Sequence, residues 1–161
     1  MLKMKYGWRF AFAGAIVMLL IGCVTRYAPP VGEDTAQIDF VNSTALQMAV
    51  FLYGDATKCT QRAMLTGGVA AGAHRPVTVA TNKELAVLVF DADSQNVCRL
   101  TLSFQPEKAK NYVFRFLGSP ENCRGGVAEV TNAGAFVRKV TTTERTFVLA
   151  FDESGHWCEA K

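Results

Sequence analysis

The sequence predicts an all-β protein, an antiparallel β-sandwich of the immunoglobulin or transthyretin type. Short segments rich in Val, Phe, Leu and Thr alternate with turn-forming clusters of Gly, Asn, Asp and Pro at fairly even intervals, as in proteins built from many strands. No segment after residue 23 sustains an apolar stripe at helical spacing. Four cysteines in the same part of the chain could staple such a domain with disulfides. An eight-stranded barrel is the nearest alternative.

The first 22 residues differ from the rest of the chain. The start carries Lys3, Lys5 and Arg9 with no acidic residue, and residues 10–22 carry no charge. A basic start, an apolar run of about 7 to 15 residues and a small residue before the cut are typical of a secretory signal peptide. The run is short for a permanent span, which needs about 20 apolar residues. We therefore expect residues 1–22 to be a helical signal peptide that is absent from the working protein.

The apolar run ends in Leu20, Ile21, Gly22 and Cys23. This motif resembles the lipobox of bacterial lipoproteins, in which aliphatic and small residues precede an invariant Cys. The resemblance implies cleavage before Cys23 by signal peptidase II and a covalent lipid on the Cys23 sulfur, and no other cofactor is expected. It also implies release to the outer membrane, on its periplasmic face, because Val24 stands where an Asp would retain a Gram-negative lipoprotein in the inner membrane. An uncleaved anchor and ordinary secretion remain alternatives.

The charge distribution supports this division of the chain. Removing the three basic residues of the leader from the 17 Lys and Arg leaves 14, against 14 Asp and Glu that all follow Cys23. A neutral mature domain argues against a nucleic-acid partner, because such binding needs clustered Lys and Arg. The expected partners are the membrane, through the lipid, and other envelope proteins.

Residues 23–35 are polar and contain Pro, which predicts a flexible tether, and residues 36–161 have the length of one domain. Within this domain the pattern of apolar segments and turn residues predicts ten strands. They are expected at 36–42, 47–53, 59–65, 75–81, 85–91, 97–104, 111–117, 126–131, 135–141 and 144–151.

Three segments are informative about their neighbours. In residues 97–104 the alternation of apolar and polar side chains predicts that Cys98 faces the core. Residues 85–91 are apolar on both faces, which predicts a central strand. Residues 43–54 could form a capped helix, but the apolar run before Gly54 favours a strand.

The C-terminal part of the domain contains several large apolar side chains. The last predicted strand places Phe147, Leu149 and Phe151 on one face, toward the core. Trp157, the only tryptophan after the leader, precedes Cys158. We expect Trp157 to pack against a disulfide, with an exposed interface anchor as the alternative.

After Cys23 is set aside, Cys59, Cys98, Cys123 and Cys158 remain, and an even number of cysteines in an exported chain predicts two disulfides. Four cysteines allow three pairings. The pairing Cys59–Cys98 with Cys123–Cys158 is favoured, because each bond would join neighbouring strands and close a loop of roughly 35 to 40 residues, worth about 3 to 4 kcal/mol. A zinc site is disfavoured, because the chain has no CxxC pair.

The sequence carries no catalytic signature. His74 lies in a loop rich in Gly and Ala, which predicts an exposed histidine. Asp152, Ser154 and His156 are the residue types of a hydrolytic triad, but neighbours in one extended tail rarely reach triad geometry, and the chain has no G-x-S-x-G elbow. We therefore expect no enzyme.

Residues 91–96 begin like a calcium-binding loop, with Asp91, Asp93 and Gln95 at alternate positions. The sixth position, however, is Asn96 instead of Gly, and the twelfth is Leu102 instead of Glu. The segment is therefore predicted to be a hairpin turn, and no metal is expected.

These observations predict a lipid-anchored envelope protein that acts as a non-enzymatic binding or structural module. One alternative is a subunit of an envelope secretion or transport assembly. Another is an inhibitor or exclusion factor that acts through the loop at 66–74 or the charged loop at 105–111. The glycines within 67–72 lack the strand and helix of a nucleotide fingerprint and are expected to form a flexible loop.

Overall fold

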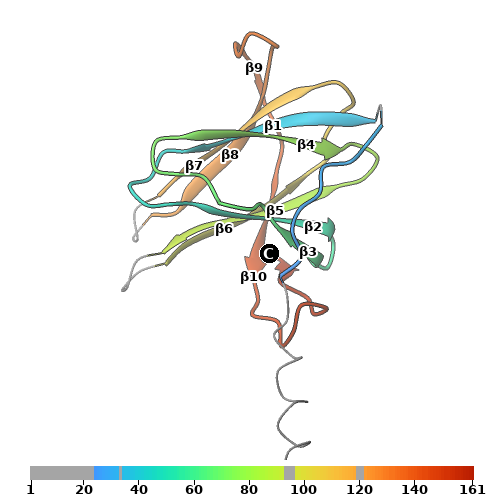
Figure 1. The fold of residues 1–161 in the computed structure, drawn as a ribbon, viewed down its shortest axis with the longest axis vertical. Coiled ribbons are helices and arrows are strands. Elements are labelled where there is room, and N and C mark those ends of the chain that lie inside the picture. The colour runs from blue at the N-terminus through green and yellow to red at the C-terminus, as the bar shows by residue number, and fades with distance from the viewer. Residues whose placement is uncertain (1–23, 33, 93–96, 119–121) are drawn as a thin grey trace, which may run out of the picture.

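The computed structural model describes residues 24–161 except 33, 93–96 and 119–121. These residues form eleven strands in two sheets (Figure 1). The strands are β1 (Thr35–Asn42), β2 (Ala49–Asp55), β3 (Thr60–Met64), β4 (His74–Ala80), β5 (Leu85–Ala92), β6 (Val97–Phe104), β7 (Asn111–Leu117), β8 (Arg124–Val130), β9 (Phe136–Lys139), β10 (Thr143–Phe147) and β11 (Cys158–Ala160). Each predicted strand overlaps one of β1 to β10, whereas β11 was not predicted.

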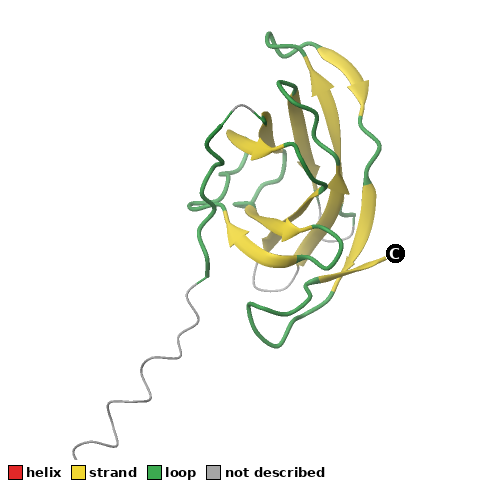
Figure 2. Cartoon of the chain, turned by 90° about the vertical axis from the view of Figure 1, so that its right-hand side faces the viewer, coloured by secondary structure: helices red, strands yellow, loops and turns green. Residues whose placement is uncertain are grey.

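The two sheets pack as the layers of a sandwich, which confirms the predicted fold class (Figure 2). One sheet has the order β4-β1-β7-β8-β9 and the other the order β11-β10-β6-β5-β2-β3. One pair departs from the antiparallel pattern, because β1 runs parallel to β7. These strands are far apart in the sequence, so the connection between them is long enough for a parallel pair.

The main core lies between the sheets and follows the alternation of the strands. Cys98 is 1% exposed, as predicted. The prediction of a central strand at 85–91 is also confirmed, because β5 lies between β6 and β2 and has both faces buried. Residues 49–55 form strand β2, not a helix. Large side chains of this core come from both sheets, among them Ile38, Phe40, Leu52, Leu102, Phe104, Tyr112, Phe114 and Phe116.

A second, smaller core covers the outer face of the six-stranded sheet. Side chains on the outer face of β2 and β5, among them Tyr53 and Leu88, pack there with Trp157 and the disulfide of Cys59 and Cys158. The prediction that Trp157 packs against a disulfide is confirmed, since its side chain is buried beside this bond. The segment between β10 and β11 therefore covers part of this outer face before the chain rejoins the sheet as β11.

The course of this segment explains why the predicted strand at 144–151 is only partly correct. Strand β10 ends at Phe147, and the chain then turns back so that β11 pairs with β10. Leu149 is 79% exposed and Phe151 is 104% exposed, so the prediction that they face the core is wrong. The alternation of residue types continues past Phe147, but the sheet does not.

Two disulfides are present, and the pairing favoured from the sequence is wrong. The bonds are Cys59–Cys158, with Cα atoms 5.3 Å apart, and Cys98–Cys123, with Cα atoms 5.4 Å apart. Cys98 lies in the core between the sheets, whereas Cys59 lies in the core on the outer face of the same sheet. A disulfide needs Cα atoms within about 7 Å and Cβ atoms that point toward each other. Cysteines in cores on opposite faces of one sheet do not meet this requirement.

Part of the segment expected to be a tether is attached to the domain. The carbonyl of Thr25 accepts a hydrogen bond from the Met64 amide at 2.8 Å, and the Tyr27 amide donates to the Met64 carbonyl at 2.9 Å. The Tyr27 hydroxyl also donates to the Thr78 carbonyl at 2.8 Å. The predicted signal peptide and Cys23, the predicted site of lipid attachment, lie outside the described residues. Among the residues that are described, no helix is long and apolar enough to cross a membrane.

Candidate functional site

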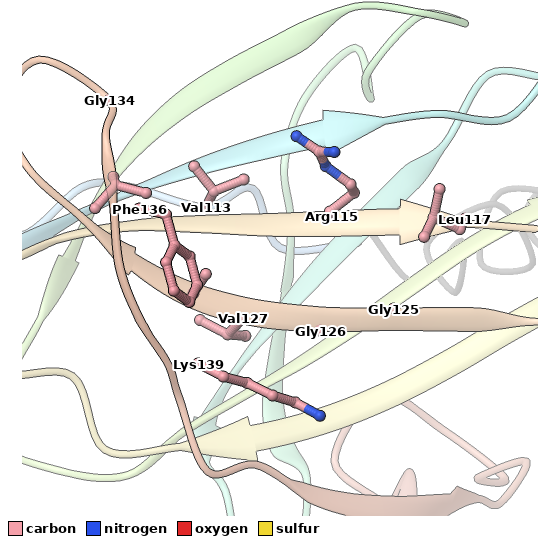
Figure 3. Close-up of a pocket in the computed structure, with 11 residues that line it drawn as sticks. Val113, Arg115, Leu117, Gly125, Gly126, Val127, Gly134, Phe136 and Lys139 are labelled. Carbon is pink, nitrogen blue, oxygen red and sulfur yellow. The ribbon is translucent and has the colours of Figure 1, made fainter.

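An open groove lies on the outer face of the five-stranded sheet, over β7, β8 and β9, with a volume of about 580 Å³ (Figure 3). This is within the range of about 300 to 1,000 Å³ that is common for ligand sites. Phe136 of β9 is 69% exposed, and Leu117 of β7 is 45% exposed. The walls are mainly apolar, with one Arg and one Lys: Val113, Arg115, Leu117, Val127, Ala128, Val130, Phe136 and Lys139.

Two glycines of β8 shape this groove in different ways. A Cβ atom at Gly126 would meet nothing within 4 Å, because this position faces the open groove. A Cβ atom at Gly125 would lie 2.5 Å from Cδ2 of Leu100 and 3.0 Å from the Arg115 carbonyl oxygen. Gly125 therefore lets β8 pack closely on the core, while Gly126 keeps the groove deep.

The turn and the pairing of the β8–β9 hairpin set the position of Phe136. Gly134 in the turn has a φ of +79°, which glycine adopts without strain. The register of β8 and β9 shifts between Glu129 and Val130. Such a bulge increases the local twist and redirects side chains, and here Phe136 pairs with Val130 on the groove side.

Two cations belong to the groove. Arg115 extends from β7 and Lys139 from β9 (Figure 3). Both side chains are exposed, and neither forms an ion pair with another residue in the described part of the chain. The groove therefore combines apolar surface with positive charge that no described acidic group neutralises.

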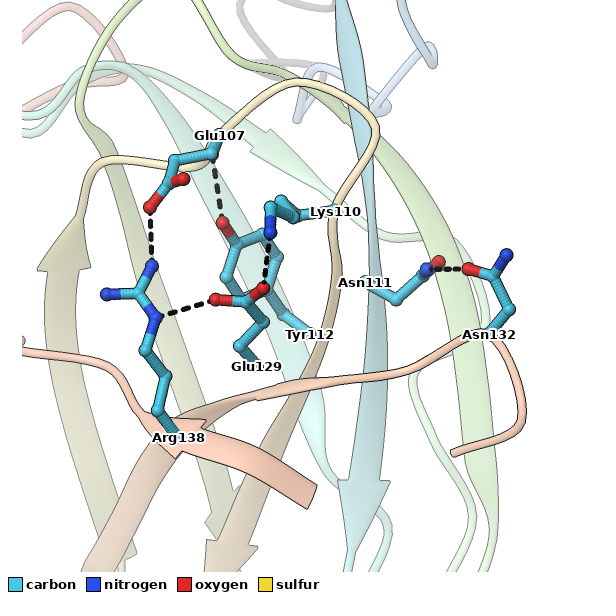
Figure 4. A network of polar contacts seen from close by, with 7 residues as sticks. All are labelled: Glu107, Lys110, Asn111, Tyr112, Glu129, Asn132 and Arg138. Atoms are coloured by element: carbon cyan, nitrogen blue, oxygen red, sulfur yellow. Dashed lines mark hydrogen bonds and ion pairs between the residues drawn. The ribbon is translucent and has the colours of Figure 1, made fainter. Parts of the chain in front are cut away.

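Behind the hairpin, a network of charged side chains fixes β9 in place (Figure 4). The carboxylate of Glu129, whose side chain is 5% exposed, accepts hydrogen bonds from Lys110 Nζ at 2.8 Å and Arg138 Nε at 2.7 Å. These two hydrogen bonds lower the pKa of the Glu129 carboxyl below its ordinary value, and the bond from Lys110 has the larger effect. Arg138 also pairs with Glu107, and the Glu107 amide donates to the Tyr112 hydroxyl at 2.9 Å.

The same network includes the loop at 105–111, one of the two loops through which an inhibitor would act. Besides the contacts of Glu107 and Lys110, the ammonium of Lys108 lies 2.8 Å from a carboxylate oxygen of Asp34. The loop is thus bound to the sheet and supports the hairpin. The loop at 66–74 is also held, since Asn42 Nδ2 donates to the carbonyl oxygen of Val69 at 2.9 Å.

The candidate catalytic residues are not brought together. His74 is exposed, as predicted, with Nδ1 3.2 Å from a carboxylate oxygen of Asp39. Asp152 accepts hydrogen bonds from the hydroxyl of Ser154 at 2.6 Å and from its amide at 2.9 Å. In the described residues, no hydrogen bond joins the His156 side chain to either of them. The pair of Asp152 and Ser154 closes a turn.

The possible metal ligands give a similar result. Asp93, Gln95 and Asn96 of the calcium-like segment lie outside the described residues, while Asp91 is buried at the end of β5. Among the described side chains, no group of three or more His, Cys, Asp or Glu residues could hold a metal ion.

A signal for the groove is present in the sequence. In 111–117 the aromatic residues of one face are buried, and Val113 and Leu117 make the opposite face apolar as well. The adjacent Gly125 and Gly126 mark a strand with little side-chain bulk. Comparison of the chain with models of known protein families and with curated proteins finds no match.

Proposed function

We propose that this chain is a lipid-anchored, non-enzymatic binding module of the bacterial envelope. The lipid on Cys23 holds it at the periplasmic face of the outer membrane, and the groove over β7, β8 and β9 binds another envelope protein. The observation that carries the binding role is the exposed Phe136 beside Arg115 and Lys139, which pair with no described acidic residue. The lipobox supports the anchor.

The proposed occupant is a segment of a partner protein that contains both apolar and acidic side chains. Exposed aromatic residues such as Phe136 are common anchors of protein interfaces. The two cations favour carboxylates, because complementary charge across an interface guides association and sets specificity. A groove of about 580 Å³ has room for a few side chains, so a short segment fits it better than a broad protein surface does.

The position of the groove supports the same proposal. In Figure 1 the β9 hairpin lies at the opposite end of the molecule from Val24, where the described chain begins. An anchor next to Val24 leaves the hairpin pointing away from the membrane. If the partner is present in fixed stoichiometry, the chain is a subunit of an envelope assembly, which is the second candidate.

The anchor is tested by labelling growing cells with a clickable palmitate analogue. The parent protein incorporates the label, and a Cys23→Ser variant does not. Equal labelling of the two proteins would refute the anchor, and it would leave the proposal for the groove to be judged separately.

The groove is tested by photocrosslinking in living cells, with a photoreactive phenylalanine analogue in place of Phe136. We expect an adduct with one envelope protein, and its loss when Arg115→Glu and Lys139→Glu are introduced together. Val97, which is 49% exposed on β6, is the matched control position and gives no such adduct. An adduct that survives the charge reversal, or that forms equally at Val97, contradicts the proposed site.

A further inference from the structure

The loop between β10 and β11, residues 148–157, exposes two large apolar side chains that belong to neither core. Leu149 is 79% exposed and Phe151 is 104% exposed. The residue between them, Ala150, packs against the outer core. Successive side chains of the loop therefore point alternately toward the outer core and toward solvent. Leu149 and Phe151 both lie on the solvent side.

Contacts on both sides hold this loop in its conformation. The Val148 amide donates to the Trp157 carbonyl at 3.0 Å, which closes the base of the loop. Glu153 accepts two hydrogen bonds from the guanidinium of Arg62, at 3.1 and 2.5 Å. That guanidinium lies over the Trp157 ring, 3.5 Å from its centre. Leu149 and Phe151 are therefore exposed by an ordered loop.

The loop lies at the end of the domain where the proposed anchor attaches. Arg26 forms a parallel bridge with Met64, so the chain that runs back from Arg26 to Val24 follows β3 toward Arg62. Arg62 is also the residue that pairs with Glu153 of the loop. Figures 1 and 2 both show the start of the described chain and this loop at the same end of the molecule.

We propose that Leu149 and Phe151 insert into the membrane that carries the Cys23 lipid, as a second contact of the domain with the bilayer. This inference rests on the proposed anchor. A lipid attached one residue before Val24 keeps the loop close to the bilayer surface, where the local concentration of lipid is high. Aromatic and aliphatic side chains gain free energy when they enter the boundary between headgroups and acyl chains.

The charges of the loop are compatible with a lipid surface. Glu153 is paired with Arg62. The Asp152 carboxylate accepts two hydrogen bonds from Ser154, which hold its pKa below the ordinary value. Both carboxylates therefore have partners within the protein, and the headgroup layer that surrounds them is polar. A membrane contact here would orient the domain so that the groove near β9 faces away from the bilayer.

The test uses the acylated mature protein, reconstituted into vesicles of phosphatidylethanolamine and phosphatidylglycerol. A Phe151→Trp variant adds a reporter to the parent, whose own Trp157 is buried. We expect the added emission to shift to the blue and to be quenched by lipids with brominated acyl chains. The matched control, Phe136→Trp at the far end, shows neither effect. Adding Leu149→Ser to the Phe151→Trp variant weakens the quenching.

Flotation of the vesicles separates failure of the inference from failure of the anchor. If the protein floats with the vesicles but Trp at position 151 is not quenched, the membrane contact is wrong and the anchor stands. Equal quenching at positions 151 and 136 also overturns the inference, because the membrane then contacts both ends of the domain alike. A blue shift without quenching by brominated lipid means that a protein surface covers the loop. If the acylated protein does not float, the anchor fails and the inference fails with it.

Discussion

The two ends of the sandwich both expose apolar side chains, but the charges beside them differ. At the end near Val24, Phe151 is accompanied by Glu153, which is paired with Arg62. At the far end, Phe136 is accompanied by Arg115 and Lys139, which pair with no described acidic residue. Apolar side chains with internally paired charges suit a lipid surface, whereas apolar side chains beside unpaired cations suit an acidic partner.

The two ends are also held by different means. The loop at 148–157 is fixed by the disulfide of Cys158 and by the stacked Arg62. The β9 hairpin is fixed by the charged network around Glu129. The disulfide and the aromatic stack of the first end do not titrate near neutrality, although Glu153 also pairs with Arg62 there. The second end is held by the ion pairs of one buried carboxylate, Glu129. Each end can therefore be perturbed without the other.

The largest effect is expected from removing the disulfide of the loop end. Replacing Cys59 and Cys158 together by Ala removes a bond that spans 99 residues, and the free energy of unfolding should fall by about 4 to 5 kcal/mol. The same change at Cys98 and Cys123, which are 25 residues apart, should cost about 3 to 4 kcal/mol. Urea unfolding of the mature chain measures both. An equal or larger loss of unfolding free energy on removal of the Cys98–Cys123 bond would contradict this prediction.

The next effect separates stability from binding within the groove. Gly125→Val places a side chain 2.5 Å from Leu100, and overpacking of this kind should cost about 1 to 3 kcal/mol. Gly126→Val meets open space, so its unfolding free energy should change by less than about 0.5 kcal/mol. The valine at position 126 nevertheless fills the groove and should abolish the crosslink from position 136. Retention of that adduct would show that the partner binds elsewhere.

The alternation of residue types predicted the sandwich well, because a buried strand face requires apolar residues at every second position. It failed where the chain leaves a sheet, as at Leu149 and Phe151, since the pattern continues after the last ladder hydrogen bond. It also failed for the disulfides. Cys59 lies in a turn, with a φ of 48°, so no alternation indicated which face of the sheet it occupies.

The candidate site was less predictable than the fold. The groove depends on a register shift at Glu129 and Val130 and on the outward direction of Gly126. Neither feature follows from local residue preference, because both arise from how three strands pair. The cations Arg115 and Lys139 are ordinary surface residues in the sequence, and they become a feature of the groove only when β7 and β9 are placed on either side of β8.

A moderate effect is expected when the stacked cation at the loop end is removed. The guanidinium of Arg62 lies 3.5 Å from the centre of the Trp157 ring and 4.7 Å from that of Phe51. Arg62→Ala should lower the unfolding free energy by about 1 to 2 kcal/mol. Hydrogen exchange should rise in residues 148–157 and stay unchanged in β9. Arg62→Lys should recover little of the lost stability, because an ammonium group does not stack on the rings as the planar guanidinium does. Faster exchange in both ends would mean that they are not independent.

The smallest effect is the pH dependence of the β9 hairpin at the far end. Hydrogen bonds from Lys110 and Arg138 lower the pKa of Glu129 below 4.5 in the folded state. A carboxylate with a lowered pKa binds protons more readily when unfolded, so its stabilisation is complete above about pH 4.5 and is lost as the pH falls through the folded value. Amide exchange in β9 should therefore accelerate at acidic pH. Residues 148–157 contain Asp152, whose pKa is lowered by hydrogen bonds from Ser154, so their own acid response should stay the same when Glu129 is replaced.

Glu129→Gln is the variant that tests this assignment, because it keeps the shape of the side chain and removes the titrating group. The variant should show the faster β9 exchange already at neutral pH, and the acid-dependent step should disappear. If the step persists in the variant, Glu129 is not the group that controls the hairpin. Because the hairpin positions Phe136, loss of the crosslink at position 136 should follow the same pH curve as the exchange, which ties the stability of the far end to its proposed binding role.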